Sequence, residues 1–109
     1  MIGYIYSIIN KMDGQRYVGQ TVDIERRRRT HFSKLRNNTH PNPLLQEAWN
    51  DWGEESFAFE FKGYCIKNQE ELDALEKQEI KKYNSYEKGY NRTPGGQGGP
   101  ITRSSITYE

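Results

Sequence analysis

Two runs of aromatic and aliphatic residues near the N-terminus, 3–9 and 16–20, flank a turn that contains Asp13-Gly14. Aromatic and β-branched residues favour strands, and glycine in the turn tolerates the positive φ that a tight hairpin requires. The sequence therefore predicts that the fold begins with a β-hairpin.

The tyrosines of this hairpin are predicted to lie on one face. Side chains alternate across a strand, so a hairpin loop with an even number of residues places Tyr17 on the same face as Tyr6. Gly19 follows on that face, and we expect it to leave open space beside two exposed phenols. Aromatic packing on a sheet and a catalytic role are both compatible with this pattern.

Four further elements follow the hairpin. Asparagines at 42 and 68 are suited to cap helices, and phenylalanines alternate along the last strand. The predicted elements are a helix over 22–37, a helix over 43–52, a strand over 56–65 and a helix over 69–83. The order β-β-α-α-β-α predicts an α+β fold in which helices flank a small three-stranded antiparallel sheet.

The composition is that of a folded protein. We expect this protein to be cytoplasmic. The 109 residues are polar, with 33% hydrophobic residues and a mean hydropathy of −1.06, but 14 aromatic residues supply buried area. We expect residues 1–96 to form one domain and residues 97–109 to be a flexible Gly-rich tail or linker. No apolar run is long enough to span a membrane, and no signal peptide is evident. The single cysteine, Cys65, excludes an internal disulfide and is expected to be buried.

The net charge of +1 conceals a segregation of charge along the chain. Residues 1–40 contain eight Lys/Arg and three Asp/Glu, residues 41–80 contain three and ten, and residues 81–109 contain five and two. Such segregation favours a polyanion on one face. Helices that are solvated by mixed charges are the alternative.

Charged residues also fall on the inward stripes of the predicted helices. In the helix over 22–37, Arg27 and His31 are one turn apart at the border of the core, whereas Arg26 and Arg29 face away and are suited to phosphates. Its neighbour Arg28 points inward, as does Glu79 on the last helix. A partly buried ion pair between these two residues is one hypothesis, and the alternative is that each side chain reaches solvent on its own.

Glu76 falls within the apolar stripe of the helix over 69–83. A carboxylate there loses hydration unless it is paired or binds a cation. A salt bridge is one interpretation, and a ligand of magnesium, held by one carboxylate together with substrate phosphate and water, is the other. Two histidines and one cysteine do not suffice for a four-ligand zinc site, and the glycines of "PGGQGG" lack the Gly-Lys-Ser/Thr of a P-loop.

The motifs in this order resemble those of the GIY-YIG nuclease family, most closely the catalytic domains of phage intron homing endonucleases. The resemblance extends from Gly3 to about Gly96. It rests on Tyr4-Ile5-Tyr6, Tyr17-Val18-Gly19, Arg27, His31, Glu76 and Asn91. One departure is that Tyr4 replaces the glycine of the first motif, with Gly3 one place earlier.

The resemblance implies a divalent-metal-dependent DNA endonuclease with a single Mg²⁺ or Mn²⁺ ion on Glu76. Tyr17 would accept the proton of the attacking water, with Tyr6 or His31 positioning it, although His31 and His40 remain alternative bases. Arg27 would contact the scissile phosphate. The catalytic residues implied are Tyr6, Tyr17, Arg27, His31, His40, Glu76 and Asn91. The residues expected to contact DNA are Gly19, Arg26, Arg27, Arg29, Lys34 and Arg36.

Two readings without catalysis remain. One is a nucleic-acid-binding domain that uses the basic helix over 22–37, and the other is a structural domain in which Glu76 merely pairs with Arg27. We expect DNA as the partner, with no small-molecule substrate. The separate DNA-recognition region of homing endonucleases is expected to be absent from this chain.

Overall fold

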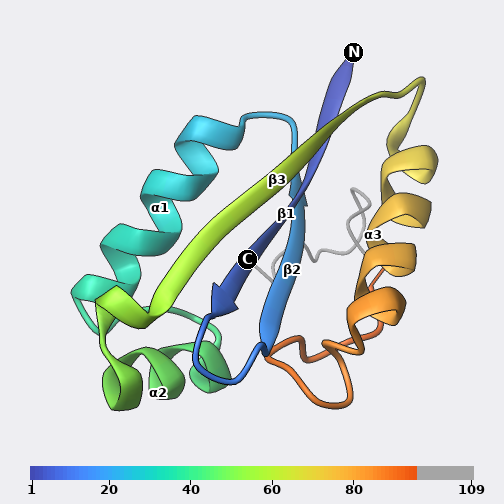
Figure 1. Ribbon diagram of the computed structural model, residues 1–109. Helices are drawn as coiled ribbons and strands as arrows, with labels where there is room; N and C mark the ends of the chain where they lie inside the picture. The colour runs from blue at the N-terminus through green and yellow to red at the C-terminus, as the bar shows by residue number, and fades with distance from the viewer. Residues whose placement is uncertain (96–109) are drawn as a thin grey trace.

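The computed structural model describes residues 1–95, which form a three-stranded sheet between two layers of helices (Figure 1). The elements are β1 (Ile2–Asn10), β2 (Arg16–Thr21), α1 (Ile24–Arg36), α2 (Pro43–Trp52), a 3-10 turn (Glu54–Ser56), β3 (Phe57–Cys65) and α3 (Gln69–Tyr83). The predicted α+β fold and its element order are therefore confirmed. The expected boundary between residues 96 and 97 lies outside the described residues.

The first strand is the centre of the sheet, whose strand order is β2-β1-β3 with antiparallel pairs throughout. In the hairpin, Tyr6 pairs with Gly19 and Ile8 pairs with Tyr17. Paired residues of neighbouring strands share a face, so Tyr6 and Tyr17 lie on the same face, as predicted. β2 is an edge strand.

Side-chain caps set the helix boundaries. The Asn42 carboxamide oxygen accepts hydrogen bonds from the backbone N–H groups of Leu44 and Leu45 at 2.9 and 3.1 Å. The Asn68 oxygen accepts from Glu71 N–H at 3.0 Å. α1 begins at Ile24 rather than at 22, because Asp23 is its N-cap.

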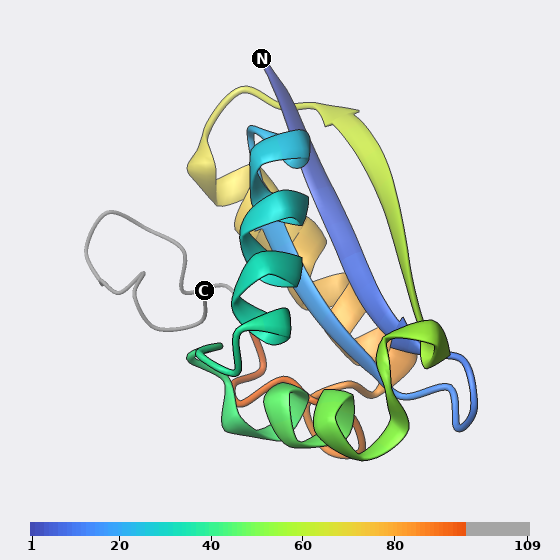
Figure 2. The same cartoon turned by 90° about the vertical axis from the view of Figure 1, so that its left-hand side faces the viewer.

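The sheet has a hydrophobic cluster on each face. The first cluster lies on the face covered by α1 and α2, and the second lies on the face covered by α3. Figures 1 and 2 show α1 and α3 on opposite sides of the sheet. The first contains Tyr6, Ile8, Tyr17, Leu35, Leu45, Ala48, Trp49, Phe57 and Tyr90. The second contains Ile5, Val18, Ile66, Leu72 and Ile80.

Gly3 lies on the second face, directly beneath Ile66 and Leu72. A Cβ at this position would lie 2.7 Å from Ile66 Cδ1 and 2.8 Å from Leu72 Cδ1. A larger residue at this position would therefore displace the ends of these two side chains beneath α3. Tyr4, on the opposite face, packs edge-on against Phe61 with ring centroids 5.9 Å apart.

Two expectations about individual residues are wrong. Arg28 pairs with Glu25 at 2.7 Å and Glu79 pairs with Lys62 at 3.2 Å, because α1 and α3 lie on opposite sides of the sheet (Figure 1). Cys65 is exposed rather than buried, since it ends β3 beyond the cover of the helices.

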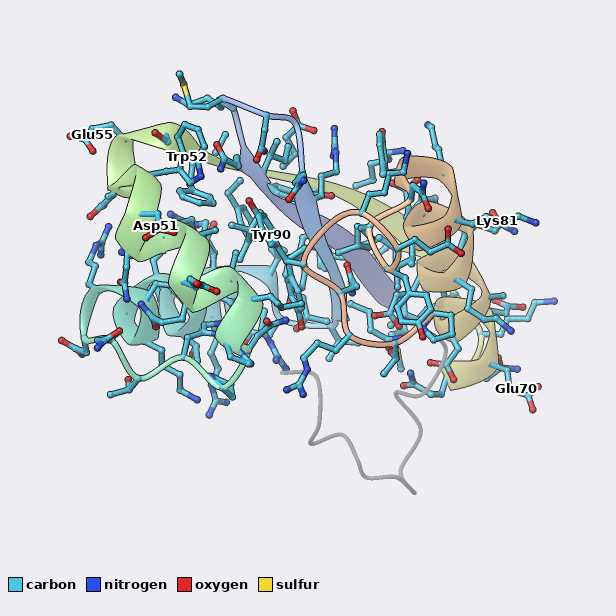
Figure 3. The ribbon with its side chains drawn as sticks, turned by 90° about the horizontal axis from the view of Figure 1, so that it is seen from below. Asp51, Trp52, Glu55, Glu70, Lys81 and Tyr90 are labelled. Carbon is cyan, nitrogen blue, oxygen red and sulfur yellow. The ribbon has the colours of Figure 1, made fainter. Side chains whose placement is uncertain are left out.

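The segment after α3 returns to the hairpin. Tyr90 lies between the layers that carry α2 and α3 (Figure 3), and its N–H donates to the Arg16 carbonyl at 2.9 Å. In the same view the acidic side chains of Asp51 and Glu55 on one side, and Glu70 on the other, lie at the surface. Within residues 1–95, no helix is both long and apolar enough to cross a bilayer.

Candidate active site

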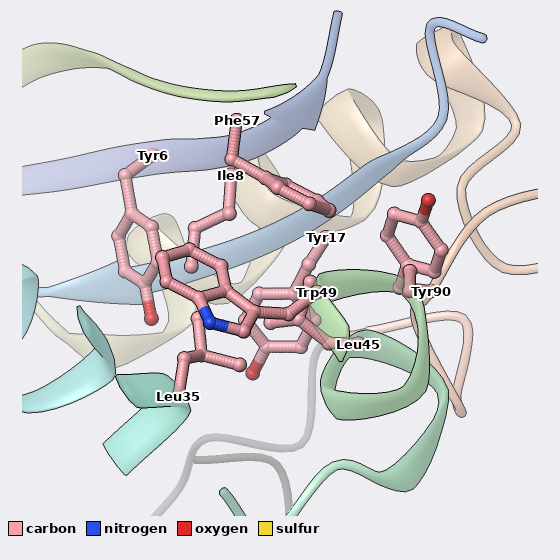
Figure 4. Packing of buried hydrophobic residues seen from close by; sticks show 9 residues of the cluster. Tyr6, Ile8, Tyr17, Leu35, Leu45, Trp49, Phe57 and Tyr90 are labelled. Atoms are coloured by element: carbon pink, nitrogen blue, oxygen red, sulfur yellow. The ribbon is translucent and has the colours of Figure 1, made fainter. Parts of the chain in front are cut away.

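The two hairpin tyrosines are buried, which corrects the expectation of exposed phenols. Tyr6 is 2% exposed and Tyr17 1% exposed, with ring centroids 6.4 Å apart. Both rings extend from the strands toward the helices that carry Leu35 and Leu45 (Figure 4). Periodicity places side chains on a face, but it does not show that α1 and α2 cover that face.

Gly19 makes room for the first of these rings. A Cβ on Gly19 would lie 2.5 Å from Tyr6 Cζ, closer than any real contact. The space that we expected beside the rings is therefore filled by the Tyr6 ring itself. Gly19 is required because the phenol crosses directly over the β2 backbone.

A chain of hydrogen bonds runs from Tyr6 through two buried histidines. The Tyr6 hydroxyl lies 2.6 Å from His31 Nε2, and His31 Nδ1 lies 2.7 Å from His40 Nε2. At the far end, the Asn42 backbone N–H donates to His40 Nδ1 at 3.0 Å. His31 is 2% exposed and lies in the core rather than at its border as predicted.

Both histidines are neutral near pH 7. Burial lowers the pKa of His31 well below its ordinary value of 6.5, and neighbouring positive charges lower it further. Proton uptake by His31 is opposed next by the neighbouring ring of His40, which competes for the same positive charge, and then by the charges of Arg27 and Lys34. Burial, with the charge of Lys34, also lowers the pKa of His40 to about 4.

Neutrality assigns the direction of every hydrogen bond in this chain. His40 Nδ1 accepts from Asn42, so the single proton of His40 is on Nε2 and is donated to His31 Nδ1. The proton of His31 is then on Nε2 and is donated to the Tyr6 oxygen. Tyr6 is thus an acceptor from His31, and its own hydroxyl proton points elsewhere.

The loop that carries His40 is fixed at several points. The His40 backbone N–H donates to Gln46 Oε1 at 3.0 Å, and the Asn42 carboxamide donates to the Tyr90 carbonyl at 2.8 Å. The histidine chain therefore ends on a rigid anchor. Asn42 was identified from the sequence only as a helix cap, because its contact with Tyr90 spans 48 residues.

Asn91 binds the outer edge of β2. Its carboxamide oxygen accepts from Val18 N–H at 2.8 Å, and its nitrogen donates to the Val18 carbonyl at 2.9 Å. β2 has no strand neighbour on that side, and an unpaired buried backbone group is costly. Asn91 therefore holds the backbone of β2, the strand that carries Tyr17, by pairing with both backbone groups of Val18.

Glu76 is 1% exposed, as its place in the apolar stripe predicted. It lies on the α3 side of the sheet, where Gln20 Nε2 donates to its Oε1 at 2.8 Å. Tyr17 and Gln20 are three residues apart on β2, so their side chains point to opposite faces. The interpretation of the hairpin face as the floor of the whole site is therefore wrong. The predicted residues lie on both sides of the edge strand β2.

The basic residues of α1 differ in their surroundings. Arg27 is half-buried, whereas Arg26, Arg29 and Lys34 are exposed. Arg36 is engaged by Glu54, with its Nη2 2.6 Å from Glu54 Oε2, and lies more than two turns along α1 from Arg27. A cavity of about 340 Å³ at the start of α1 is lined by Thr21, Val22, Asp23, Arg26, Arg27 and Thr30.

The donor set limits which metal the site could hold. Within residues 1–95, no three His, Cys, Asp or Glu side chains are grouped as a metal centre. A single buried carboxylate fits a hard ion that takes most of its ligands from water and substrate. It does not fit a tetrahedral zinc site.

Comparisons with known proteins identify the family of this chain. Residues 2–91 match the family model of the GIY-YIG catalytic domain, so the chain belongs to the GIY-YIG family. The solved structure of the catalytic domain of the homing endonuclease I-TevI is similar, with a TM-score of 0.76 and 29% identity over 82% of this chain and 96% of that chain. A structure of a mutant of the catalytic domain of intron endonuclease I-TevI gives a TM-score of 0.69 and 28% identity over 86% and 96% of the two chains. No curated protein sequence matches the chain.

Proposed function

We propose that this GIY-YIG domain is a divalent-metal-dependent DNA endonuclease of the homing-endonuclease type. The observation that carries the proposal is the buried chain of His40, His31 and Tyr6 beside Tyr17. A structural domain gains little from two neutral histidines in its core, because burying polar rings has a desolvation cost. A hydrolase gains a phenol whose oxygen is held in one orientation.

The direction of the hydrogen bonds restricts the choice of general base. His31 accepts a hydrogen bond from His40 at Nδ1 and donates one to Tyr6 from Nε2, so neither nitrogen is available to deprotonate water. We therefore propose that the histidines orient Tyr6 and that a tyrosine, rather than His31 or His40, is the base. A hydrogen bond donated to the Tyr6 oxygen also stabilises negative charge there. Tyr17, beside the same His31 ring, is the second candidate.

Roles can also be proposed for Arg27, Glu76 and Asn91. Arg27 is proposed to bind the scissile phosphate, where its interaction strengthens as charge builds in the transition state. Glu76 would hold one Mg²⁺ or Mn²⁺ ion, which supplies Lewis-acid stabilisation of the phosphoryl oxygens. Asn91 is proposed to hold the β2 backbone in place for Tyr17.

DNA contacts are proposed on the α1 side. Arg26 and Arg29 are exposed and suited to phosphates on either side of the cleaved bond, as is Lys34. Gly19 was expected to contact DNA, but it is buried beneath the Tyr6 ring, so we assign it a role in placing that ring rather than a DNA contact. Arg36 would first have to leave Glu54, so we assign it the weakest contribution.

Nicking of supercoiled plasmid by the purified protein tests this function. We expect nicking in magnesium, none in EDTA, and none with Glu76→Gln, while DNA binding by that variant survives because α1 supplies the contacts. The matched control is Glu70→Gln, which removes an exposed carboxylate from the same helix. Binding without nicking by a folded wild-type protein would instead favour a non-catalytic DNA-binding domain.

A further inference from the structure

On the α3 side of β2, the side chain of Gln20 lies between two carboxylates. Its Nε2 donates to Glu76 Oε1 at 2.8 Å and to Asp73 Oδ1 at 2.9 Å. A carboxamide nitrogen has two N–H groups, so these two bonds use both of them. Ionised carboxylates only accept, and the nitrogen of Gln20 must therefore face them while its oxygen faces away.

A second carboxamide closes the network. Gln69 Nε2 donates to Gln20 Oε1 at 2.6 Å and to Asp73 Oδ1 at 2.7 Å. Asp73 thus accepts from both amides, and Gln20, Gln69 and Asp73 form a ring of hydrogen bonds. Gln69 and Asp73 are four residues apart on α3, so they lie on one face of that helix.

We infer that Gln20 is a positioning residue for Glu76, and that Asp73 and Gln69 hold Gln20 in the orientation this requires. The inference rests on the proposed metal-binding role of Glu76. The hydrogen bond from Gln20 to Oε1 fixes the plane of the Glu76 carboxylate, and with it the direction of Oε2. Donors of this kind orient ligating carboxylates, and their removal commonly weakens metal affinity or activity by about 10- to 100-fold.

The position of Gln20 supports a role in the site. It is the last residue but one of β2, one residue after Gly19, and its backbone is continuous with the strand that carries Tyr17. A shift of Gln20 would therefore move Glu76 relative to the tyrosines on the other face. The network is a link between the two sides of the site.

The test compares Gln20→Met with the matched control Gln15→Met. Methionine is close to glutamine in length and has no N–H donor, and the Gln15 side chain is exposed on the hairpin turn. For Gln20→Met we expect the Mn²⁺ concentration at half-maximal single-turnover nicking to rise by about tenfold. The rate at saturating Mn²⁺ and the affinity for DNA in EDTA should change little. Gln15→Met should match the wild type.

A second readout does not depend on cleavage. In ¹⁵N-labelled protein, Mn²⁺ should broaden the side-chain amide signals of Gln20 and Gln69 before those of Gln15, and Glu76→Gln should abolish this selectivity. If Gln20→Met does not fold, Gln69→Ala at an exposed position replaces it, with an expected rise of about threefold in the Mn²⁺ midpoint.

The outcomes separate this inference from the proposed function. If Glu76→Gln abolishes nicking but folded Gln20→Met keeps the wild-type Mn²⁺ midpoint, Gln20 is not a positioning residue and only the inference fails. If Glu76→Gln nicks DNA with an unchanged Mn²⁺ requirement, the metal-binding role of Glu76 fails and the inference fails with it. A raised midpoint together with selective broadening supports both.

Discussion

Lowering the pH should destabilise this protein through its two histidines. The pKa of His40 is about 4 in the folded protein, against an ordinary value of 6.5, and the pKa of His31 is also well below that value. At a pH between the folded and the ordinary pKa of a histidine, that histidine binds a proton in the unfolded chain but not in the folded protein. The free energy of unfolding therefore falls as the pH falls from 6.5 towards 4, and it is independent of these groups above pH 7.

The size of the effect can be worked out for His40 alone. With pKa values of about 4 folded and 6.5 unfolded, linkage gives a loss of about 2 kcal/mol on going from pH 7.5 to pH 5. Some solvent contact remains at His40, so about 1 to 2 kcal/mol is the expected range. His31 contributes with the same sign.

Urea unfolding at several pH values between 7.5 and 5, for the wild type and the double variant His31→Gln, His40→Gln, measures this effect. The variant is less stable at pH 7.5 because it loses packing and hydrogen bonds, but its carboxylates titrate as in the wild type. The difference between the two proteins should therefore narrow by at least 1 kcal/mol towards pH 5. A difference that is constant with pH would refute the neutral, buried histidine chain.

Three further predictions concern residues around this chain. Arg27→Ala should fold normally and lose about 10²-fold or more in its single-turnover nicking rate, as when a transition-state donor is removed. The control Arg29→Ala, at an exposed position, should keep most of its nicking rate. Near-normal cleavage by Arg27→Ala would exclude the proposed contact between Arg27 and the scissile phosphate. If Tyr17 is the general base, Tyr17→Phe should lose most of its nicking rate with little change in its affinity for DNA. An unchanged nicking rate would assign the role of general base to Tyr6. Gly19→Ala should destabilise the domain by about 1 to 3 kcal/mol in urea unfolding, because its Cβ would displace the Tyr6 ring. A variant as stable as the wild type would show that the Tyr6 ring can adopt another conformation at no cost in stability.

Local signals were enough to predict the elements. The asparagine caps at 42 and 68 gave the starts of α2 and α3 without error, since a cap depends only on the next three residues. The burial of Glu76 was likewise predicted from the 3.6-residue period. Each of these predictions concerns a single helix and does not depend on how two elements pack together.

Predictions that required two elements to be placed together failed. Arg28 and Glu79 each point inward on a wheel, but the sheet lies between their helices, and each residue finds a partner nearer by. The phenols were expected to be exposed because the hairpin pattern contains no information about α1. Gln20 gave no signal at all, since its partners on α3 are about 50 residues away along the chain.

The division of the site between two faces has a consequence for the substrate. Tyr6 and Tyr17 approach from the α1 side, and Glu76 approaches from the α3 side. A phosphodiester that must meet both groups has to lie at the outer edge of β2, because elsewhere the sheet separates the faces. Asn91 already occupies that edge at Val18, so the phosphate is expected farther along β2, towards the start of α1 and Arg27. The same route leads to the cavity at the start of α1. Blocking that cavity should therefore inhibit cleavage. A bulky thiol adduct at Thr30→Cys, in a Cys65→Ser background, should abolish nicking. The same adduct on native Cys65, which lies on the opposite edge strand β3, should leave nicking intact.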